Sequence, residues 1–300
     1  MEIGLIGAGK MGFNLIGNFL DKGFQVYVHD INKETLSKVS ETYQVPTYDE
    51  LSDFLNHRKE KRIIWVMLPA GEITYGALEK LLEELSQGDV VIEGGNSNPK
   101  DSKKIGMCFQ QKGIYFFDVW TSGGTYGARH GASYMIGGDS EKFKEIEEIF
   151  RETSKKEGYI YVGKNGAGHF LKIVHNAILY GYMQTLSEGF SILEQSEYDY
   201  DLSAVADSWA QTSVVRGWLL ELASQAFSKD PKLEEFTGKI GASRSTNWVM
   251  DFAMENKIAI PVISTALFAR YKSQDEDKFS EKMISALRKE VGGNTEKKWF

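Results

Sequence analysis

The feature that most constrains this chain is a glycine-rich turn close to its N-terminus. Gly7, Gly9 and Gly12 follow the apolar run 3–6 and open a helix-like segment, and Asp30 ends the next apolar run. In a dinucleotide-binding unit, the first glycine permits a tight turn, the second lets the backbone approach a pyrophosphate, and the third lets the helix pack on the strand. The acidic residue accepts hydrogen bonds from ribose hydroxyls. The pattern therefore predicts a βαβ unit that binds a dinucleotide.

The charges around this turn favour NAD over NADP. A carboxylate at Asp30 repels the 2′-phosphate of NADP, and no arginine occurs before Arg58. Lys33 is the nearby cation that could weaken this preference. NAD is the expected cofactor.

The first half of the chain alternates between short apolar runs and helix-like segments. This alternation is typical of a parallel sheet covered by helices on both faces. The predicted strands are residues 3–6, 25–29, 63–67, 90–92, 115–118, 134–136 and 159–162.

After residue 162 the periodicity becomes helical. The predicted helical stretches are residues 166–180, 183–193, 202–227, 248–255, 261–271 and 276–289. We therefore expect an α/β Rossmann domain with a doubly wound, mostly parallel sheet at residues 1–164, followed by an all-α helical domain at residues 165–300.

The helical stretch 166–180 carries an unusual polar stripe. Lys172, His175 and Asn176 stand at positions i, i+3 and i+4 and so share one helix face, among apolar residues that indicate packing on several sides. A buried ammonium is costly unless it is paired or loses its proton, and a neutral lysine is a good general base. The alternative is a lysine whose head reaches solvent while its stem packs on apolar neighbours. The helix alone leaves both interpretations open.

Two further glycine-containing loops follow predicted strands. These are Glu93–Ser97 and Thr121–Gly124, in which Asn96 and Ser122 offer donors for hydroxyls or a carboxylate. Each loop taken singly could be a plain turn. Because both lie beyond the carboxyl ends of strands, where an open parallel sheet places its ligand, they indicate a shared site.

Composition excludes several other classes of protein. The formal net charge of −7 gives no basic patch for nucleic acid, and no apolar run is long enough to cross a membrane. Cys108 is the single cysteine, and neither it nor the five histidines show zinc-site spacing, so we expect no metal. The chain begins directly with a strand-like run, which predicts a cytoplasmic protein without a signal peptide. A small-molecule substrate is the expected partner.

These motifs together resemble the 6-phosphogluconate dehydrogenase family. The resemblance runs nearly end to end, and the length is similar to that of the short, NAD-preferring bacterial branch, which lacks a long C-terminal extension. The residues that carry it are the turn 4–12, the loop 93–97, the segments 122–124 and 127–131, the helix 166–176 and Phe268–Arg270.

The resemblance implies a catalytic role for Lys172 with Asn176. Lys172 is expected to take the proton of the carbon-3 hydroxyl as hydride passes to the nicotinamide, and to return a proton to the ketone oxygen as the carboxylate leaves. His175 and Asn176 would orient substrate hydroxyls, and Asn96 would bridge cofactor and substrate. The implied substrate contacts are Asn96, Ser122, Gly123, Gly124, His175, Asn176, Tyr180, Arg244 and Arg270. Among them, Tyr180 and Arg270 would bind the phosphate. Arg244 or neighbouring hydroxyls would take the place of a phosphate-contact stretch that is usually rich in lysine in the family.

We assign cofactor binding to a second set of residues. This set consists of Gly7, Ala8, Gly9, Lys10, Met11, Gly12, Asp30, Leu68, Pro69, Ala70 and Asn96. We also expect a homodimer or homotetramer that forms through the helical domain, because most soluble oligomers are symmetric.

One position departs from the family. The glutamate that protonates carbon 1 of the enediol is Leu179 here, and leucine cannot give a proton. Three hypotheses follow. The first is an NAD-dependent decarboxylating dehydrogenase of 6-phosphogluconate, and the second is a non-decarboxylating dehydrogenase or reductase of a related acid. The third is a catalytically silent dinucleotide-binding paralogue. The retained Lys172 and Asn176 argue against this third hypothesis.

Overall fold

The computed structural model describes residues 1–276 and 278–292. It divides into two compact units, the first spanning Met1–His175 and the second beginning at Asn176. Helix α8 (Ala167–Glu194) crosses this division. The domain boundary expected from the sequence, between residues 164 and 165, lies just before this helix.

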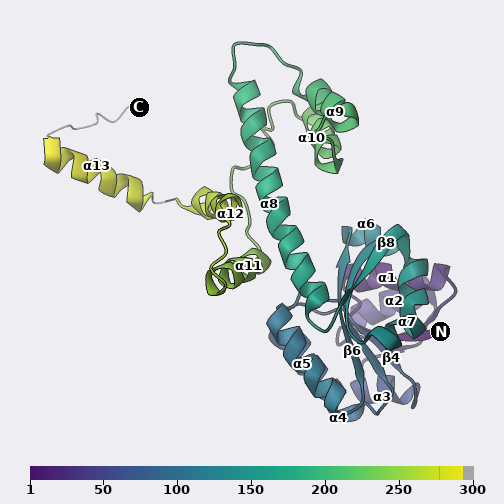
Figure 1. The fold of residues 1–300 in the computed structure, drawn as a ribbon. Helices are drawn as coiled ribbons and strands as arrows, with labels where there is room; N and C mark the ends of the chain where they lie inside the picture. The colour runs from purple at the N-terminus through teal and green to yellow at the C-terminus, as the bar shows by residue number, and fades with distance from the viewer. Residues whose placement is uncertain (277, 293–300) are drawn as a thin grey trace. The chain divides into compact units, whose positions relative to one another are not determined.

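An eight-stranded sheet forms the centre of the first unit (Figure 1). Its strand order is β3-β2-β1-β4-β5-β6-β7-β8. Neighbouring strands from β3 to β6 are parallel, β7 runs antiparallel to β6, and β8 is parallel to β7. The strands are β1 (Glu2–Ile6), β2 (Gln25–His29), β3 (Thr47–Tyr48), β4 (Ile63–Val66), β5 (Val90–Glu93), β6 (Tyr115–Ser122), β7 (Ala132–Gly137) and β8 (Ser154–Gly163).

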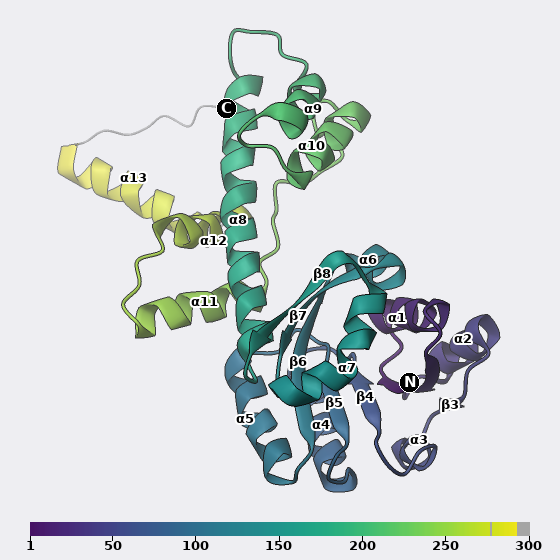
Figure 2. The ribbon, with the colours of Figure 1, turned by 45° about the vertical axis from the view of Figure 1, so that its right-hand side comes forward.

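Helices cover both faces of this sheet, so the predicted doubly wound fold is confirmed (Figures 1 and 2). One apolar core joins α1, α2, α6 and α7 to one face, and a second joins α3, α4 and α5 to the other. The helices are α1 (Lys10–Asp21), α2 (Lys33–Tyr43), α3 (Leu51–Asn56), α4 (Glu72–Glu84), α5 (Pro99–Gln111), α6 (Gly124–His130) and α7 (Ser140–Thr153). Within the sheet, only the two-residue edge strand β3 carries too little apolar pattern to be predicted.

The described part of the second unit is helical, as the sequence predicted. Besides α8 it contains α9 (Leu202–Thr212), α10 (Trp218–Lys229), α11 (Arg244–Glu255), α12 (Pro261–Gln274) and α13 (Phe279–Gly292). A small core formed by residues such as Phe190, Leu220 and Phe227 joins α8, α9 and α10.

Several helix limits differ from the predictions. The stretches 166–180 and 183–193 form the single helix α8, and α11 begins at Arg244 instead of residue 248. The stretch 202–227 was predicted as one helical segment, but α9 ends at Thr212, and extended backbone at Ser213 and Gly217 separates it from α10. The last predicted helix, 276–289, includes Asp277, which lies outside the described residues, and α13 begins at Phe279. None of the described helices is both long and apolar enough to span a membrane.

The strand order fixes where a ligand should bind. From β1 the chain first adds β2 and β3 on one side and then β4, β5 and β6 on the other. Such a reversal leaves a crevice at the carboxyl ends of the strands, the usual ligand site of open α/β sheets. The glycine turn after β1 and the loops after β4, β5 and β6 all lie at this edge.

Candidate active site

The glycine turn after β1 has the shape that a dinucleotide requires. Gly7 has a φ of +94°, and a Cβ there would lie 2.4 Å from the carbonyl oxygen of Met67. A Cβ on Gly12 would lie 2.0 Å from the carbonyl oxygen of Gly7, whereas a Cβ on Gly9 would meet no atom within 4 Å. Two glycines are therefore needed for packing, and the third faces open space directly before α1. Because the first N–H groups of a helix lack intrahelical acceptors, the turn fits a pyrophosphate.

Asp30 is held against this turn. Its Oδ2 accepts a hydrogen bond of 2.8 Å from the Ala8 N–H, and its Oδ1 accepts one of 2.9 Å from the Asn32 N–H. The exposed ammonium of Lys33 instead lies 3.0 Å from the carboxylate of Asp49. The cation that could have favoured NADP is thus already paired with another acid.

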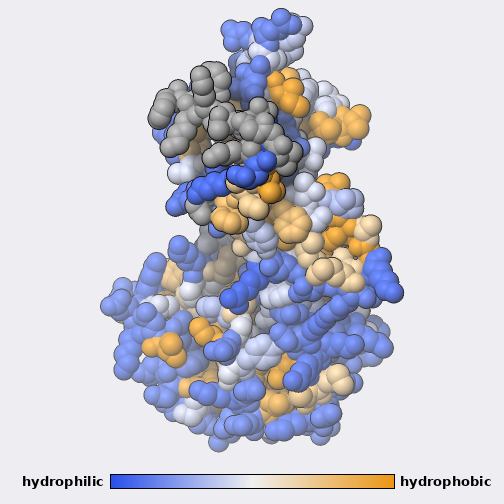
Figure 3. Space-filling view, turned by 90° about the vertical axis from the view of Figure 1, so that its left-hand side faces the viewer, coloured by the Kyte–Doolittle hydropathy of each residue, from blue (hydrophilic) through white to orange (hydrophobic). Residues whose placement is uncertain are grey.

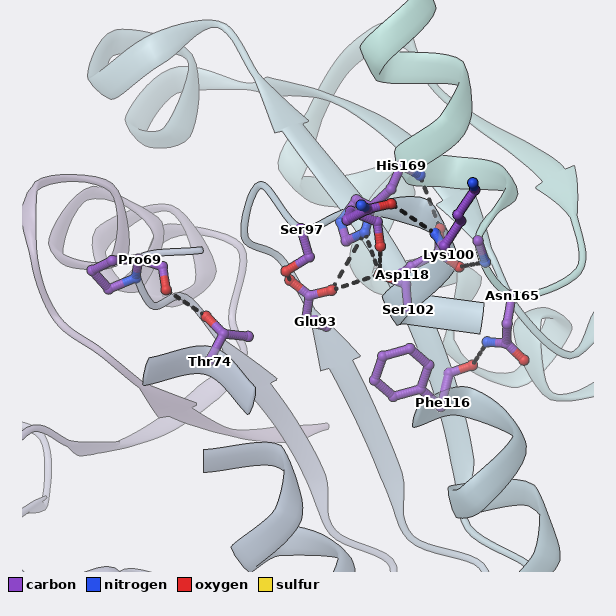
Figure 4. Close-up of polar contacts among 12 residues, drawn as sticks. Pro69, Thr74, Glu93, Ser97, Lys100, Ser102, Phe116, Asp118, Asn165 and His169 are labelled. Atoms are coloured by element: carbon purple, nitrogen blue, oxygen red, sulfur yellow. Dashed lines mark hydrogen bonds and ion pairs between the residues drawn. The ribbon is translucent and has the colours of Figure 1, made fainter. Parts of the chain in front are cut away.

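The other predicted cofactor contacts lie along the same edge. Lys10 is exposed and Met11 half-buried at the start of α1, and Asn96 is exposed after β5. Leu68 is half-buried after β4, and the loop that continues through Pro69 and Ala70 is braced by a 2.7 Å hydrogen bond from Thr74 Oγ1 to the Pro69 carbonyl (Figure 4).

Lys172 is buried in the first unit. Lys172 is only 5% exposed, and its Nζ donates a 2.9 Å hydrogen bond to the Oγ of Ser122 at the end of β6. The same Nζ lies 5.2 Å from the ring centroid of Trp120. Burial lowers the pKa of Lys172 to about 8. The geometry therefore matches the general-base interpretation better than that of a lysine whose head reaches solvent.

Strand β6 fixes the start of helix α8. Asp118 Oδ1 accepts a 2.6 Å hydrogen bond from the Gly166 N–H, and its Oδ2 accepts one of 2.9 Å from the His169 N–H. A Cβ on Gly168 would lie 2.4 Å from the Asp118 carbonyl oxygen, so only glycine permits this close approach. Since side chains alternate along a strand, Asp118, Trp120 and Ser122 share one face of β6. That face holds the beginning of α8 and the head of Lys172.

A buried polar cluster lies beside the contact between β6 and the start of α8 (Figure 4). This cluster was not predicted from the sequence. Glu93 Oε1 accepts a 2.9 Å hydrogen bond from Ser97 Oγ, and its Oε2 lies 3.2 Å from Ser102 Oγ and 3.3 Å from His169 Nδ1. Burial raises the pKa of the neighbouring Asp118. The available signal was an acidic residue directly after each of the apolar runs 90–92 and 115–117.

A second set of predicted residues gathers within the second unit. The Arg270 guanidinium lies 3.6 Å from the ring centroid of Tyr180, and its Nη1 donates a 2.7 Å hydrogen bond to the Gly241 carbonyl. The Tyr180 hydroxyl accepts a 2.8 Å hydrogen bond from the N–H of Ser243, the residue that precedes α11. Tyr180 and Arg270 are thus fixed beside the loop that leads into α11.

The first turn of α11 is rich in polar groups. The helix begins at the exposed Arg244, and Asn176 Nδ2 lies 3.5 Å from Ser245 Oγ. Thr246 is fully buried, and its Oγ1 has no hydrogen-bond partner among the described residues. This set offers guanidinium, hydroxyl and helix N-terminal donors, which are the groups that bind phosphate.

The middle of α8 is more exposed than the sequence suggested. His175 is exposed, Leu179 is half-buried and Ile178 is 60% exposed, so the expected packing on several sides does not extend to these positions. Apolar spacing alone does not distinguish a buried helix face from one that remains uncovered in a single chain.

Comparison with known proteins identifies the family. Residues 2–163 match the model of the NAD binding domain of 6-phosphogluconate dehydrogenase, and residues 168–298 match the model of its C-terminal domain. The chain belongs to the 6-phosphogluconate dehydrogenase family. It is therefore an oxidoreductase with a pyridine-nucleotide-binding domain.

Its relatives include both short and long members of this family. A Bacillus subtilis (strain 168) protein, YqeC, whose name as a 6-phosphogluconate dehydrogenase is provisional, is 42% identical over 99% of this chain and 100% of its own length. The NAD(+)-dependent, decarboxylating 6-phosphogluconate dehydrogenase of Haloferax volcanii is 32% identical over 96% of each chain. The structure of Plasmodium falciparum 6-phosphogluconate dehydrogenase matches with a TM-score of 0.85 and 26% identity, covering 98% of this chain and 66% of that one.

Proposed function

We propose that this protein catalyses the NAD-dependent oxidative decarboxylation of 6-phosphogluconate to ribulose 5-phosphate and carbon dioxide. The observation that carries this proposal is the buried Lys172, whose Nζ contacts Ser122 Oγ at 2.9 Å and whose pKa is lowered to about 8 by burial. A lysine that is partly neutral near physiological pH can accept a proton, which an ordinary lysine rarely does. The relative from Haloferax volcanii bears the same activity in its name.

NAD is the proposed cofactor. The turn Gly7–Gly12 would receive the pyrophosphate, and Asp30 would accept the adenosine ribose hydroxyls. The carboxylate of Asp30 disfavours a 2′-phosphate, and Lys33, a cation that could compensate for it, pairs with Asp49. When NAD is bound, its nicotinamide ring would accept the hydride.

Lys172 performs the proton chemistry of the proposed reaction. The neutral amine accepts the proton of the carbon-3 hydroxyl while hydride leaves carbon 3, which gives a β-keto acid. The bond between carbons 1 and 2 then breaks, carbon dioxide departs, and the electron pair moves toward the ketone oxygen. Lys172 returns its proton to that oxygen, so the same group serves as base and then as acid.

The phosphate end of the substrate is assigned to the second unit. Arg270 lies over the Tyr180 ring, and the exposed Arg244 begins α11. Arginine binds phosphate through paired N–H donors, and a helix N-terminus adds further donors. Asn176, one turn beyond Lys172 on α8, would orient a substrate hydroxyl.

Leu179 favours a second candidate function. Without an acid at this position, the enediol left by decarboxylation must take its proton from water, Tyr180 or His175. A non-decarboxylating dehydrogenase of a related hydroxy acid would need no such donor, because hydride transfer requires only the base and the cofactor. This alternative predicts NADH without carbon dioxide.

One experiment separates these functions. The purified protein is incubated with NAD and 6-phosphogluconate while NADH and carbon dioxide are measured together. Equal amounts of both products support the proposal, and NADH alone on this or another hydroxy acid supports the alternative. Binding of NAD without turnover of any β-hydroxy acid would leave the silent paralogue.

A further inference from the structure

We propose that Trp120 is a positioning residue that stabilises the ammonium form of Lys172 through the face of its indole ring. This inference rests on the proposed role of Lys172 as the base of the reaction. Trp120 lies on β6 between two positions of the same face, Asp118 and Ser122, and is 7% exposed. Lys172 Nζ lies 5.2 Å from its ring centroid, which is within the range of cation–π attraction.

The indole is held in place by a second ring. His169, one helical turn before Lys172, lies edge-on to Trp120 with ring centroids 6.1 Å apart and an interplanar angle of 85°. His169 is itself fixed by Ser102 Oγ at 2.8 Å from its Nδ1 and by the hydrogen bond from its backbone N–H to Asp118. The contacts that fix the start of α8 therefore also hold the indole ring beside Lys172.

The two buried carboxylates near the start of α8 have other partners. Glu93 at the end of β5 lies 3.3 Å from His169 Nδ1, and Asp118 on β6 accepts backbone N–H groups. His175 follows on α8 and is exposed, and Lys103 on α5 is exposed, with its Cβ beside Gly166, the residue before the helix. Across residues 1–276 and 278–292, the polar and ring contacts of Lys172 Nζ are with Ser122 and Trp120, and no carboxylate forms an ion pair with it.

This pair of neighbours suits a group that must both take and return a proton. A carboxylate beside the ammonium would hold the proton and raise the pKa of the lysine strongly. A ring face attracts the cation more weakly and accepts no proton. Trp120 thus opposes part of the cost of burying the ammonium while leaving Lys172 able to titrate.

The test changes the ring electrostatics at nearly constant shape. Trp120 is replaced site-specifically by mono-, di- and trifluorotryptophan, because each fluorine weakens the negative face of the ring. The pKa of Lys172 is followed by carbon NMR in protein labelled at the lysine ε-carbon, with the signal assigned by Lys172→Met. We expect the pKa to fall stepwise, by about one unit over the series, which is a tenfold change in proton affinity.

A matched control and a kinetic measurement complete the design. The same fluorinated series at Trp209, a partly exposed residue of α9, should leave the pKa of Lys172 unchanged. In the Trp120 series, the acid limb of the pH profile of kcat/KM should move to lower pH as the pKa of Lys172 measured by NMR falls. A pKa of Lys172 that stays constant across the Trp120 series overturns the inference. A falling NMR value with an unmoved kinetic limb supports it and instead overturns the role of Lys172 as the base.

Discussion

The carboxylate of Asp118 accepts a 2.9 Å hydrogen bond from the backbone N–H of His169. This contact joins β6 to the first turn of α8 although the two residues are far apart in the sequence. Because Lys172 follows His169 by three positions and Ser122 follows Asp118 by four, the contact also sets the approach of the lysine head to the serine hydroxyl. The proposed base is therefore positioned by a strand and a helix, and not by a loop.

Replacing the proposed base should sharply reduce turnover and spare cofactor binding. Lys172→Met keeps most of the apolar stem but cannot accept a proton, so kcat should fall by roughly 10²- to 10⁴-fold or more. NAD affinity, measured by fluorescence titration, should remain unchanged. Lys164→Met, at an exposed position just before α8, is the matched control. Activity of Lys172→Met within a few-fold of the parent would return Lys172 to a purely structural role.

The lowered pKa of Lys172 predicts a specific pH profile. The neutral amine is the active form, so kcat/KM should rise as pH increases through about 8 and level off above it. An ordinary lysine would place this limb near pH 10. Initial rates with 6-phosphogluconate across the neutral and alkaline range, at saturating NAD, measure the limb. A limb near the ordinary lysine value would contradict the proposed effect of burial.

Asp30 should determine the cofactor preference. The parent protein is expected to bind NAD more tightly than NADP, and Asp30→Ala should narrow that gap by about tenfold, or ~1.4 kcal/mol. Asp30→Asn separates the effect of the charge from that of the hydrogen bond. It removes the charge yet retains an oxygen that can accept the Ala8 N–H. Calorimetric titration of both cofactors tests this prediction. Equal affinity of the parent for NAD and NADP would refute it.

Leu179 should make protonation of the enediol slow. The expected time course with 6-phosphogluconate is a burst of NADH followed by slower turnover, and Leu179→Glu should raise the steady rate by up to about 10²-fold. The gain shrinks if the apolar surroundings disfavour an ionised or well-oriented carboxyl.

The neighbouring Ile178→Glu provides the control for this change, since Ile178 is exposed on another side of α8. It should leave the steady rate unaltered. Stoichiometric carbon dioxide at a rate that Leu179→Glu does not change would show that another group already supplies the proton.

The second unit should associate with another copy. Most of the exposed large hydrophobic residues occur after residue 175, among them Trp218 at 68%, Phe268 at 56% and Trp209 at 37%, and hydrophobic side chains are visible at the surface in Figure 3. Large exposed apolar surfaces usually mark interfaces, and symmetric homo-oligomers are the commonest solution. We propose a homodimer or homotetramer, with a light-scattering mass at least twice the 33.8 kDa of one chain. A mass near one chain at micromolar concentration would argue decisively against it.

The sequence was sufficient for those features that depend on local pattern. The glycine turn and the alternation of apolar runs with helices specified the doubly wound sheet, because each needs only the steric demands of a few neighbouring residues. The direction of β7 was not specified. It depends on how the short helix α6 returns the chain to the edge of β6, which apolar spacing does not encode.

The sequence also named Lys172 but left open whether it is a base or a lysine that reaches solvent. Tertiary structure decided only whether the lysine head is buried, since the burial that lowers its pKa comes from segments distant in the chain. Ser122 and Trp120 are contributed by β6, and the cluster of Glu93, Ser102 and His169 brings three separate elements together. Local pattern can supply a lysine on a helix, but only the packing of that helix on the sheet sets the environment of its ammonium.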